Sequence, residues 1–157
     1  MRKILLLTTL LFSGALHAEL PGILHWQSDQ DIETVYSSVS NALEENRFFI
    51  VFEPNIGKNL AGFSERWGED YNRNKLTAIR SMVFCNGWYA NGVSNLDPEM
   101  LALCPLHITL YEQQGKTHIV FLRPGYVSEG SDAQPLLQEV EQSVSAAIEA
   151  GIKSATP

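Results

Sequence analysis

Apolar residues recur every three or four positions in two stretches of the chain, which is the spacing of an amphipathic helix packed against a core. The first stretch contains Ile32, Val35, Tyr36, Val39 and Leu43. The second contains Leu137, Val140, Val144, Ala147 and Ile148. We therefore expect one helix that ends near Asn46 and a longer helix near the C-terminus. The pairs Ser28/Asp31 and Ser131/Gln134 predict a capping box at the start of each.

Runs of β-branched and aromatic residues predict the strands. They lie at residues 22–27, 47–53 and 78–85 and on both sides of Gln114-Gly115. The run at 47–53 is almost wholly apolar, so we expect it to be a buried strand. Gln114-Gly115 predicts a hairpin turn, and this turn would place Tyr111 opposite His118 and Leu110 opposite Ile119.

The hairpin register separates two faces of the predicted sheet. One face would carry Ile108, Leu110, Ile119 and Phe121 and is typical of a core. The other would carry His107, Thr109, Tyr111, His118, Val120 and Leu122. This second face is half apolar, which favours a subunit contact or a ligand surface.

The remaining segments predict short helices. Residues 55–76 have large apolar residues at helical spacing but several glycines, so we expect a partly helical insertion. Residues 86–95 predict one short helix, and residues 96–103 predict another, with Asp97 as its cap and Pro98 at its first position. The resulting order predicts an α+β domain, in which the first and last helices pack on one face of an antiparallel sheet.

The N-terminus has the pattern of an export signal. Arg2 and Lys3 precede an apolar run that is too short to span a bilayer as a helix, and small residues follow it. We expect a signal peptide at residues 1–18, cut after Ala18 or alternatively after Ala15, and a single domain at 19–157. The predicted location is the periplasm or the exterior of the cell, without membrane insertion.

Charge excludes one class of partner. The chain has 11 basic and 18 acidic residues, and removal of Arg2 and Lys3 with the signal leaves a net charge near −9. Because an acidic surface repels phosphate backbones, we expect no nucleic-acid partner.

The order and spacing of the motifs resemble the domain of unknown function 302 family. The residues that carry the resemblance are Phe84, Cys85 and Asn86, Asp97 and Pro98, Pro105, and Tyr111, Glu112 and Gly115. The resemblance implies a TATA-binding-protein-like β-α-β4-α fold and a tendency to form homodimers, and it implies no reaction. Some members are exported and are associated with sulfur-oxidising or electron-transfer genes. Gly87 and Trp88 follow Asn86 here, where many members have proline.

The two cysteines are the first candidates for chemistry. Cys85 and Cys104 lie at junctions between strands and helices in a chain that we expect to be exported, so a structural disulfide is one interpretation. A redox or sulfur-transfer pair is another, because Cys85 would lie at a helix N-terminus, where the thiol pKa falls. A third is a pair of inert free thiols.

The histidines lack the close spacing of a metal site, so we expect no metal and no cofactor. Non-covalent haem or copper binding for electron transfer, using His107 or a methionine such as Met82 or Met100, is the alternative. Trp67, Trp88 and Tyr89 would form either core packing or a pocket wall.

A non-enzymatic binding or accessory protein that acts as a homodimer is the preferred function, with a small molecule or a partner protein as its ligand. It is preferred because no nucleophile–base pairing or phosphate loop is present. The candidate ligand or interface residues are Asn86, Trp88, Tyr89, His107, Tyr111 and His118. The thiol and electron-transfer functions stand as alternatives.

Overall fold

The computed structural model describes residues 20–156. The predicted signal peptide at 1–18, with its cut after Ala15 or Ala18, lies outside the described residues. Within residues 20–156, no helix is both long and apolar enough to cross a membrane.

Five strands form one antiparallel sheet. In spatial order they are β1 (Ile23–Ser28), β5 (Lys116–Leu122), β4 (Leu106–Gln113), β3 (Ala78–Cys85) and β2 (Phe49–Phe52). A short turn connects β4 to β5, whereas the chain passes from β1 at one edge of the sheet through a helix to β2 at the other edge. The predicted α+β class and the β-α-β4-α order are confirmed.

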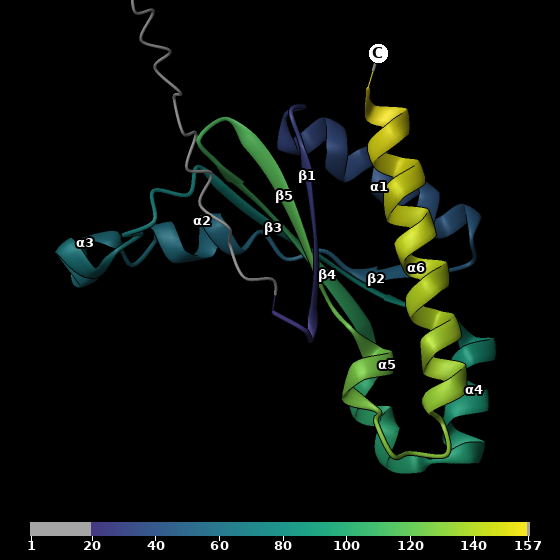
Figure 1. Cartoon of the computed structure of the whole chain (residues 1–157). Helices are drawn as coiled ribbons and strands as arrows, with labels where there is room; N and C mark the ends of the chain where they lie inside the picture. Colours follow the sequence, from purple (N-terminus) through teal and green to yellow (C-terminus); the bar gives the residue numbers. More distant parts are fainter. Residues whose placement is uncertain (1–19, 157) are drawn as a thin grey trace, which may run out of the picture.

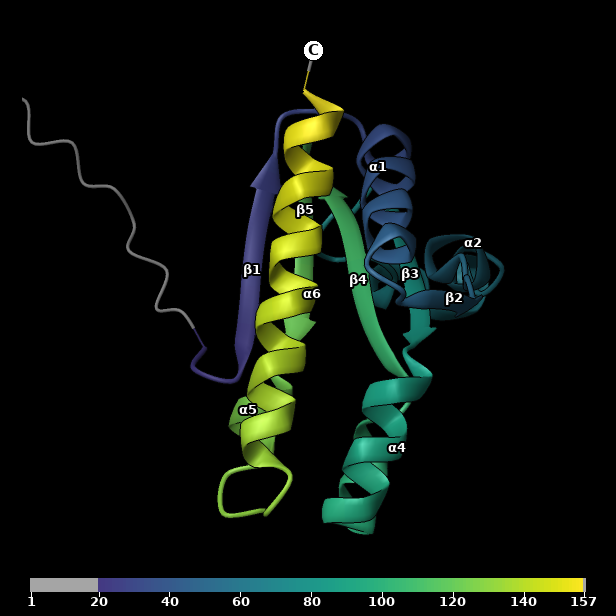
Figure 2. The ribbon, with the colours of Figure 1, turned by 90° about the vertical axis from the view of Figure 1, so that its right-hand side faces the viewer.

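Two helices cover one face of this sheet. α1 (Ile32–Glu45) and α6 (Gln134–Ala155) lie side by side across it, and the strands run behind them in Figure 2. Their apolar stripes are buried, as the periodicity predicts: Val35, Val39, Leu43, Val144 and Ile148 are all fully buried. The prediction of two helices on one face is therefore confirmed.

The hairpin has the predicted register. Tyr111 lies opposite His118 and Leu110 lies opposite Ile119. The predicted core face is buried beneath the helices, since Ile108, Leu110, Ile119 and Phe121 are at most 1% exposed. Gln114 and Gly115 both have positive φ. This is the conformation of a two-residue hairpin loop whose twist matches that of the flanking strands.

Both predicted capping boxes are wrong in detail. Asp31 is itself the N-cap of α1 and accepts hydrogen bonds from the backbone N–H groups of Glu33 and Thr34, whereas Ser28 is the last residue of β1. Ser131 lies before α6, where its hydroxyl donates to Asp97 at 2.5 Å. At α1 the Asp31 carboxylate takes the capping position, whereas α6 begins after Ala133 with no side-chain cap.

The predicted burial of β2 is also wrong. β2 is an edge strand, and Phe49, Val51 and Phe52 are 58%, 61% and 63% exposed, while Ile50 alone packs on the core. An apolar run predicts a strand but does not tell a central strand from an edge strand, because that depends on which other strands pair with it.

Short helices fill the connections. The insertion after β2 contains α2 (Ile56–Ala61), α3 (Ser64–Trp67) and η1 (Gly68–Asp70), so its predicted helical character is confirmed, and in Figure 1 it projects from the side of the sheet opposite α1 and α6. α4 (Gly87–Leu96) and the 3-10 helix η2 (Pro98–Leu103) connect β3 to β4, and α5 (Pro124–Val127) follows β5. Asp97 caps η2 as predicted, through the N–H of Glu99.

Candidate functional site

Three rings form a row on the face of the sheet that α1 and α6 leave uncovered. His25 of β1, His118 of β5 and Tyr111 of β4 supply them. The Tyr111 and His118 rings stack with 4.6 Å between centroids and 3° between planes. The His25 and His118 centroids are 5.1 Å apart, with 11° between planes. The row thus crosses three neighbouring strands.

A hydrogen bond joins the two histidines. His25 Nε2 and His118 Nδ1 are 2.9 Å apart, and the tautomers decide which nitrogen donates. Burial lowers the pKa of His118 below its ordinary value, and the charges of His25 and Lys116 lower it further. The lowered pKa favours the neutral imidazole of His118, which has one donor and one acceptor nitrogen.

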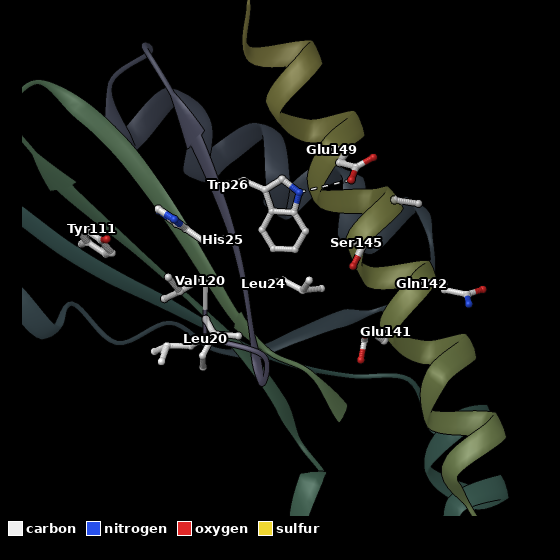
Figure 3. A pocket seen from close by; sticks show the side chains of 12 residues that line it. Leu20, Leu24, His25, Trp26, Tyr111, Val120, Glu141, Gln142, Ser145 and Glu149 are labelled. Atoms are coloured by element: carbon white, nitrogen blue, oxygen red, sulfur yellow. Dashed lines mark hydrogen bonds between the residues drawn. The ribbon is translucent and has the colours of Figure 1, made fainter. Parts of the chain in front are cut away.

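A cavity of about 660 Å³ runs along the β1 edge beside this row. Figure 3 shows Leu20, His25, Tyr111 and Val120 on one side of β1, and Leu24 and Trp26 on the other side, facing α6. Trp26 Nε1 donates a 3.4 Å hydrogen bond to Glu149 on α6. The cavity is therefore mainly apolar, with a few polar groups at its borders, which suits a small organic ligand.

The haem or copper candidates from the sequence are not brought together. Met82 is fully buried on the core face of the sheet. His107 pairs with Val83, the next residue of β3, and therefore lies on the opposite face. His107 is exposed, and Met100 packs against a separate small cluster around Val93 and Leu137. Within residues 20–156, no group of three or more His, Cys, Asp or Glu side chains is placed to hold a metal ion.

The two cysteines line one small cavity. Cys85 ends β3, Cys104 follows η2, and both thiols are free. This cavity holds about 20 Å³, room for about one water. Burial raises the pKa of the Cys104 thiol, and the neighbouring Cys85 raises it further. The predicted disulfide stays a prediction.

The residues after Cys85 have different surroundings. Asn86 is the N-cap of α4, and its side chain accepts hydrogen bonds from the N–H groups of Trp88 and Tyr89.

Tyr89 stacks on Phe48 with 5.9 Å between ring centroids, and its hydroxyl donates a 2.8 Å hydrogen bond to Glu139. Trp88 is 81% exposed, so the core-packing interpretation is wrong for it. An aromatic residue with so much exposed surface is a candidate for contact with a partner.

A second cavity, of about 580 Å³, lies between the helical insertion and the N-terminal half of β3. Trp67, stacked on Phe63 at 5.1 Å and 40% exposed, contributes to its wall. Arg80 and Glu33 also line it, and they form an ion pair at 2.6 Å. The pocket-wall interpretation of Trp67 thus fits its position.

Sequence reasoning missed His25 as a site residue. It lies 93 positions from His118, and no local spacing connects the two. The available signal was the alternation in residues 22–27, which places His25 on the uncovered face once β1 is known to pair with β5.

Comparison with known proteins gives a family and a fold. The domain of unknown function DUF302 matches residues 24–151. A solved structure, the crystal structure of an uncharacterized conserved DUF302 protein from Bacillus stearothermophilus, superposes with a TM-score of 0.71 at 15% sequence identity, over 83% of this chain and 98% of that chain. No curated protein matches the chain. Because one family covers most of the chain, from β1 to α6, the protein belongs to the DUF302 family.

Proposed function

We propose that this protein is an exported, non-enzymatic binding or accessory protein that acts as a homodimer through the β2 edge of its sheet and the part of the uncovered face next to that edge. The observation that carries the proposal is the exposure of β2. Phe49, Val51 and Phe52 are each more than half exposed, on a strand that ends the sheet formed by residues 20–156. An exposed apolar edge strand, even one of four residues, can pair with another strand.

A second copy of the chain is the partner that fits this edge best. Two β2 strands can pair antiparallel about a two-fold axis, so that the same residues contact one another from both sides. The pairing would satisfy free backbone groups and cover the exposed aromatic rings in one step. Phe52 lies opposite Val83 of β3, so the covered surface would extend from the edge onto the uncovered face.

The ligand-binding part of the proposal rests on the opposite edge. There, the cavity beside β1 joins the ring row of His25 and Tyr111 and offers apolar walls with few polar groups. Since this cavity is at the far edge of the sheet from β2, dimerisation would leave it open. A small organic molecule or a partner side chain is the class of ligand that it would take.

Sedimentation velocity over a range of protein concentrations tests the homodimer. We expect a dimer in the native protein, and we expect Phe49→Lys and Phe52→Lys to sediment as monomers, because each places a charge in the apolar contact. Val127→Lys is the matched control, since Val127 is 45% exposed on α5, away from β2. A native protein that stays monomeric at its highest soluble concentration would contradict the proposal.

Export has its own test. The proposal rests on the basic start and apolar run of residues 1–18. The intact mass of protein isolated from the periplasm should correspond to a chain that begins at Glu19, or at Leu16 if the cut follows Ala15. A full-length mass that includes Met1, in protein recovered from the cytoplasm, would exclude export.

The cysteines support a second candidate, a thiol pair that forms a disulfide after export. The observation in its favour is that Cys85 and Cys104 line the same cavity. A stable disulfide would be structural, whereas an easily reduced one would favour redox or sulfur-transfer chemistry. A thiol count on unreduced protein, repeated after mild and strong reductants, separates these two roles. If both thiols of the periplasmic protein react freely without reductant, both the structural disulfide and the redox disulfide would be excluded.

A further inference from the structure

The helical insertion after β2 differs in charge from the rest of the protein. Residues 54–80 contain five basic and three acidic residues, a net charge of +2, whereas the whole chain has a net charge of −7. The insertion also exposes large apolar side chains, since Leu60, Phe63 and Trp67 are 36%, 48% and 40% exposed. Positive charge beside exposed apolar surface is a combination that suits an organic anion.

The cavity of about 580 Å³ between this insertion and β3 brings both kinds of group together. Leu60 of α2 and Trp67 of α3 contribute apolar surface from the insertion, and Leu76 and Ile79 contribute it from the chain that enters and forms β3. A cavity of this volume, with apolar walls and a small number of charged groups, is within the range of small-molecule sites.

The walls of the cavity are fixed to the sheet. A Cβ atom at Gly57 would stand 3.0 Å from the backbone nitrogen of Ile79, so α2 lies directly against β3. On the other side, the Asn72 side chain accepts a hydrogen bond from the N–H of Leu76 at 2.9 Å and donates to its carbonyl at 2.8 Å. A ligand would therefore enter a site that is already formed, which lowers the cost of binding.

Lys58 supplies the positive charge that a ligand can use. Three cationic side chains line the cavity, Lys58, Arg73 and Arg80. Arg73 and Arg80 are each paired with an acidic residue that also lines it. Lys58 forms no ion pair with any carboxylate in residues 20–156. We propose that this cavity binds a small organic anion with an apolar body, in which Lys58 pairs with the acidic group and Trp67 packs against the body.

This site goes beyond the proposed function. It shares no lining residue with the cavity beside β1, to which the proposed function assigns a ligand. It also requires neither a dimer nor export, so the sedimentation and mass measurements above leave it untouched.

Three naphthalene compounds of similar size test the site by calorimetry at neutral pH. Naphthoate is an anion, naphthalenemethanol is neutral, and naphthylmethylammonium is a cation. We expect naphthoate to bind with a stoichiometry of one and about 5-fold more tightly than the alcohol, because one unit charge at contact distance contributes about that factor even in a water-like medium. The cation should bind most weakly. Added salt should weaken the binding of naphthoate but not that of the alcohol.

Lys58→Gln should weaken naphthoate binding about 5-fold and leave the affinity for naphthalenemethanol unchanged. Lys75→Gln is the matched control, because Lys75 is exposed in the same insertion, lies outside the lining of the cavity and changes the net charge equally. Its affinity for both compounds should equal that of the parent.

Trp67→Leu should weaken the binding of naphthoate and of the alcohol alike, by about 2–10-fold, because it removes an aromatic wall from the cavity. Trp88→Leu is its control, since Trp88 is 81% exposed on α4 and does not line this cavity. Circular dichroism checks that each variant is folded.

Equal losses in Lys58→Gln and Lys75→Gln would overturn the proposal, because they would reflect the charge of the whole insertion rather than a site. An alcohol that binds as tightly as naphthoate, or a parent protein that binds no naphthoate, would also overturn it. One measurement needs no variant: naphthoate should shift the backbone amide resonances of α2 and of residues 67–80 in the nuclear magnetic resonance spectrum. Shifts centred on β1 and α6 would place the ligand in the other cavity and would contradict the proposal.

Discussion

Gly151 of α6 lies directly against the backbone of Val39 in α1. A Cβ atom at Gly151 would stand 2.6 Å from Val39 Cα and 2.9 Å from its backbone nitrogen. Both residues are buried, and this contact lies where the two helices cross above the sheet. The distance between packed helices depends on the side chains at their contact, so the absence of a side chain allows this close approach.

We expect Gly151→Ala to destabilise the protein. Alanine favours a helix over glycine by about 1 kcal/mol, but here its methyl group would meet backbone rather than a movable side chain. Overpacking of this kind costs about 1–3 kcal/mol, so the free energy of unfolding should fall. Urea denaturation of the purified variant measures the change. Gly87→Ala is the control, since nothing lies within 4 Å of a Cβ there, and it should be neutral or stabilising.

Tyr36 should make stability depend on alkaline pH. Its hydroxyl donates to Glu53 at 2.8 Å, and burial, that hydrogen bond and the charge of Glu53 raise the pKa of Tyr36 to about 12. In the unfolded chain the phenol ionises near pH 10. Between these values the unfolded state binds fewer protons than the folded state, so the free energy of unfolding falls as pH rises from about 10 to about 12.

The variant Tyr36→Phe isolates this effect. It should lose about 1 kcal/mol at neutral pH, because it lacks the hydrogen bonds to Glu53 and to the Ser81 carbonyl. It should then show a shallower decline in stability above pH 10 than the parent does. Thermal unfolding at a series of alkaline pH values provides the comparison. Parallel curves for the two proteins would mean that Tyr36 titrates normally.

Replacement of Gln114 by asparagine should stabilise the β4–β5 hairpin. Gln114 has φ +54° and Gly115 has φ +75°. The left-handed conformation costs an ordinary L-residue about 1–2 kcal/mol, whereas asparagine adopts it readily. We expect Gln114→Asn to raise the free energy of unfolding by about 0.5–1 kcal/mol, measured in urea. Gly115→Ala should lower it, and a loss in Gln114→Asn would argue against this turn geometry.

The reduced Cys104 thiol should react slowly. Burial raises its pKa, and Cys85 raises it further, so little thiolate is present at neutral pH. Alkylation by iodoacetamide, located by peptide mass spectrometry, should be slower at Cys104 in the folded protein than in urea. Cys85→Ser removes the charge effect of Cys85, which is the smaller of the two causes of the raised pKa. Alkylation of Cys104 in this variant should therefore be faster than in the folded parent but slower than in urea. Equal rates in folded and unfolded protein would contradict the buried setting of this thiol.

Local patterns were sufficient for most of the fold. The turn residues Gln114-Gly115 specify the register of the hairpin, and that register places Ile108 and Phe121 opposite each other on the core face. The burial of β2 could not be predicted in the same way. Phe49 and Phe52 have the composition of a core strand, but only the order of strands puts them at an edge.

The candidate site was less accessible to sequence reasoning. The sequence predicts that Tyr111 and His118 are neighbours, because one short turn joins their strands. His25 joins them from a strand that precedes α1, and Trp88 is exposed because α4 presents it away from the small cluster that contains Val93. Such contacts depend on how whole elements pack together.

The sequence alone determined the two helical stripes, the hairpin register and the α+β class, because each depends on residues a few positions apart whose conformations are set by local sterics and hydrogen bonds. The tertiary structure decided the exposed β2 edge, the shared cavity of Cys85 and Cys104, and the meeting of His25 with His118. These features join residues far apart in the chain, and burial of the common core beneath α1 and α6 is what brings their strands together.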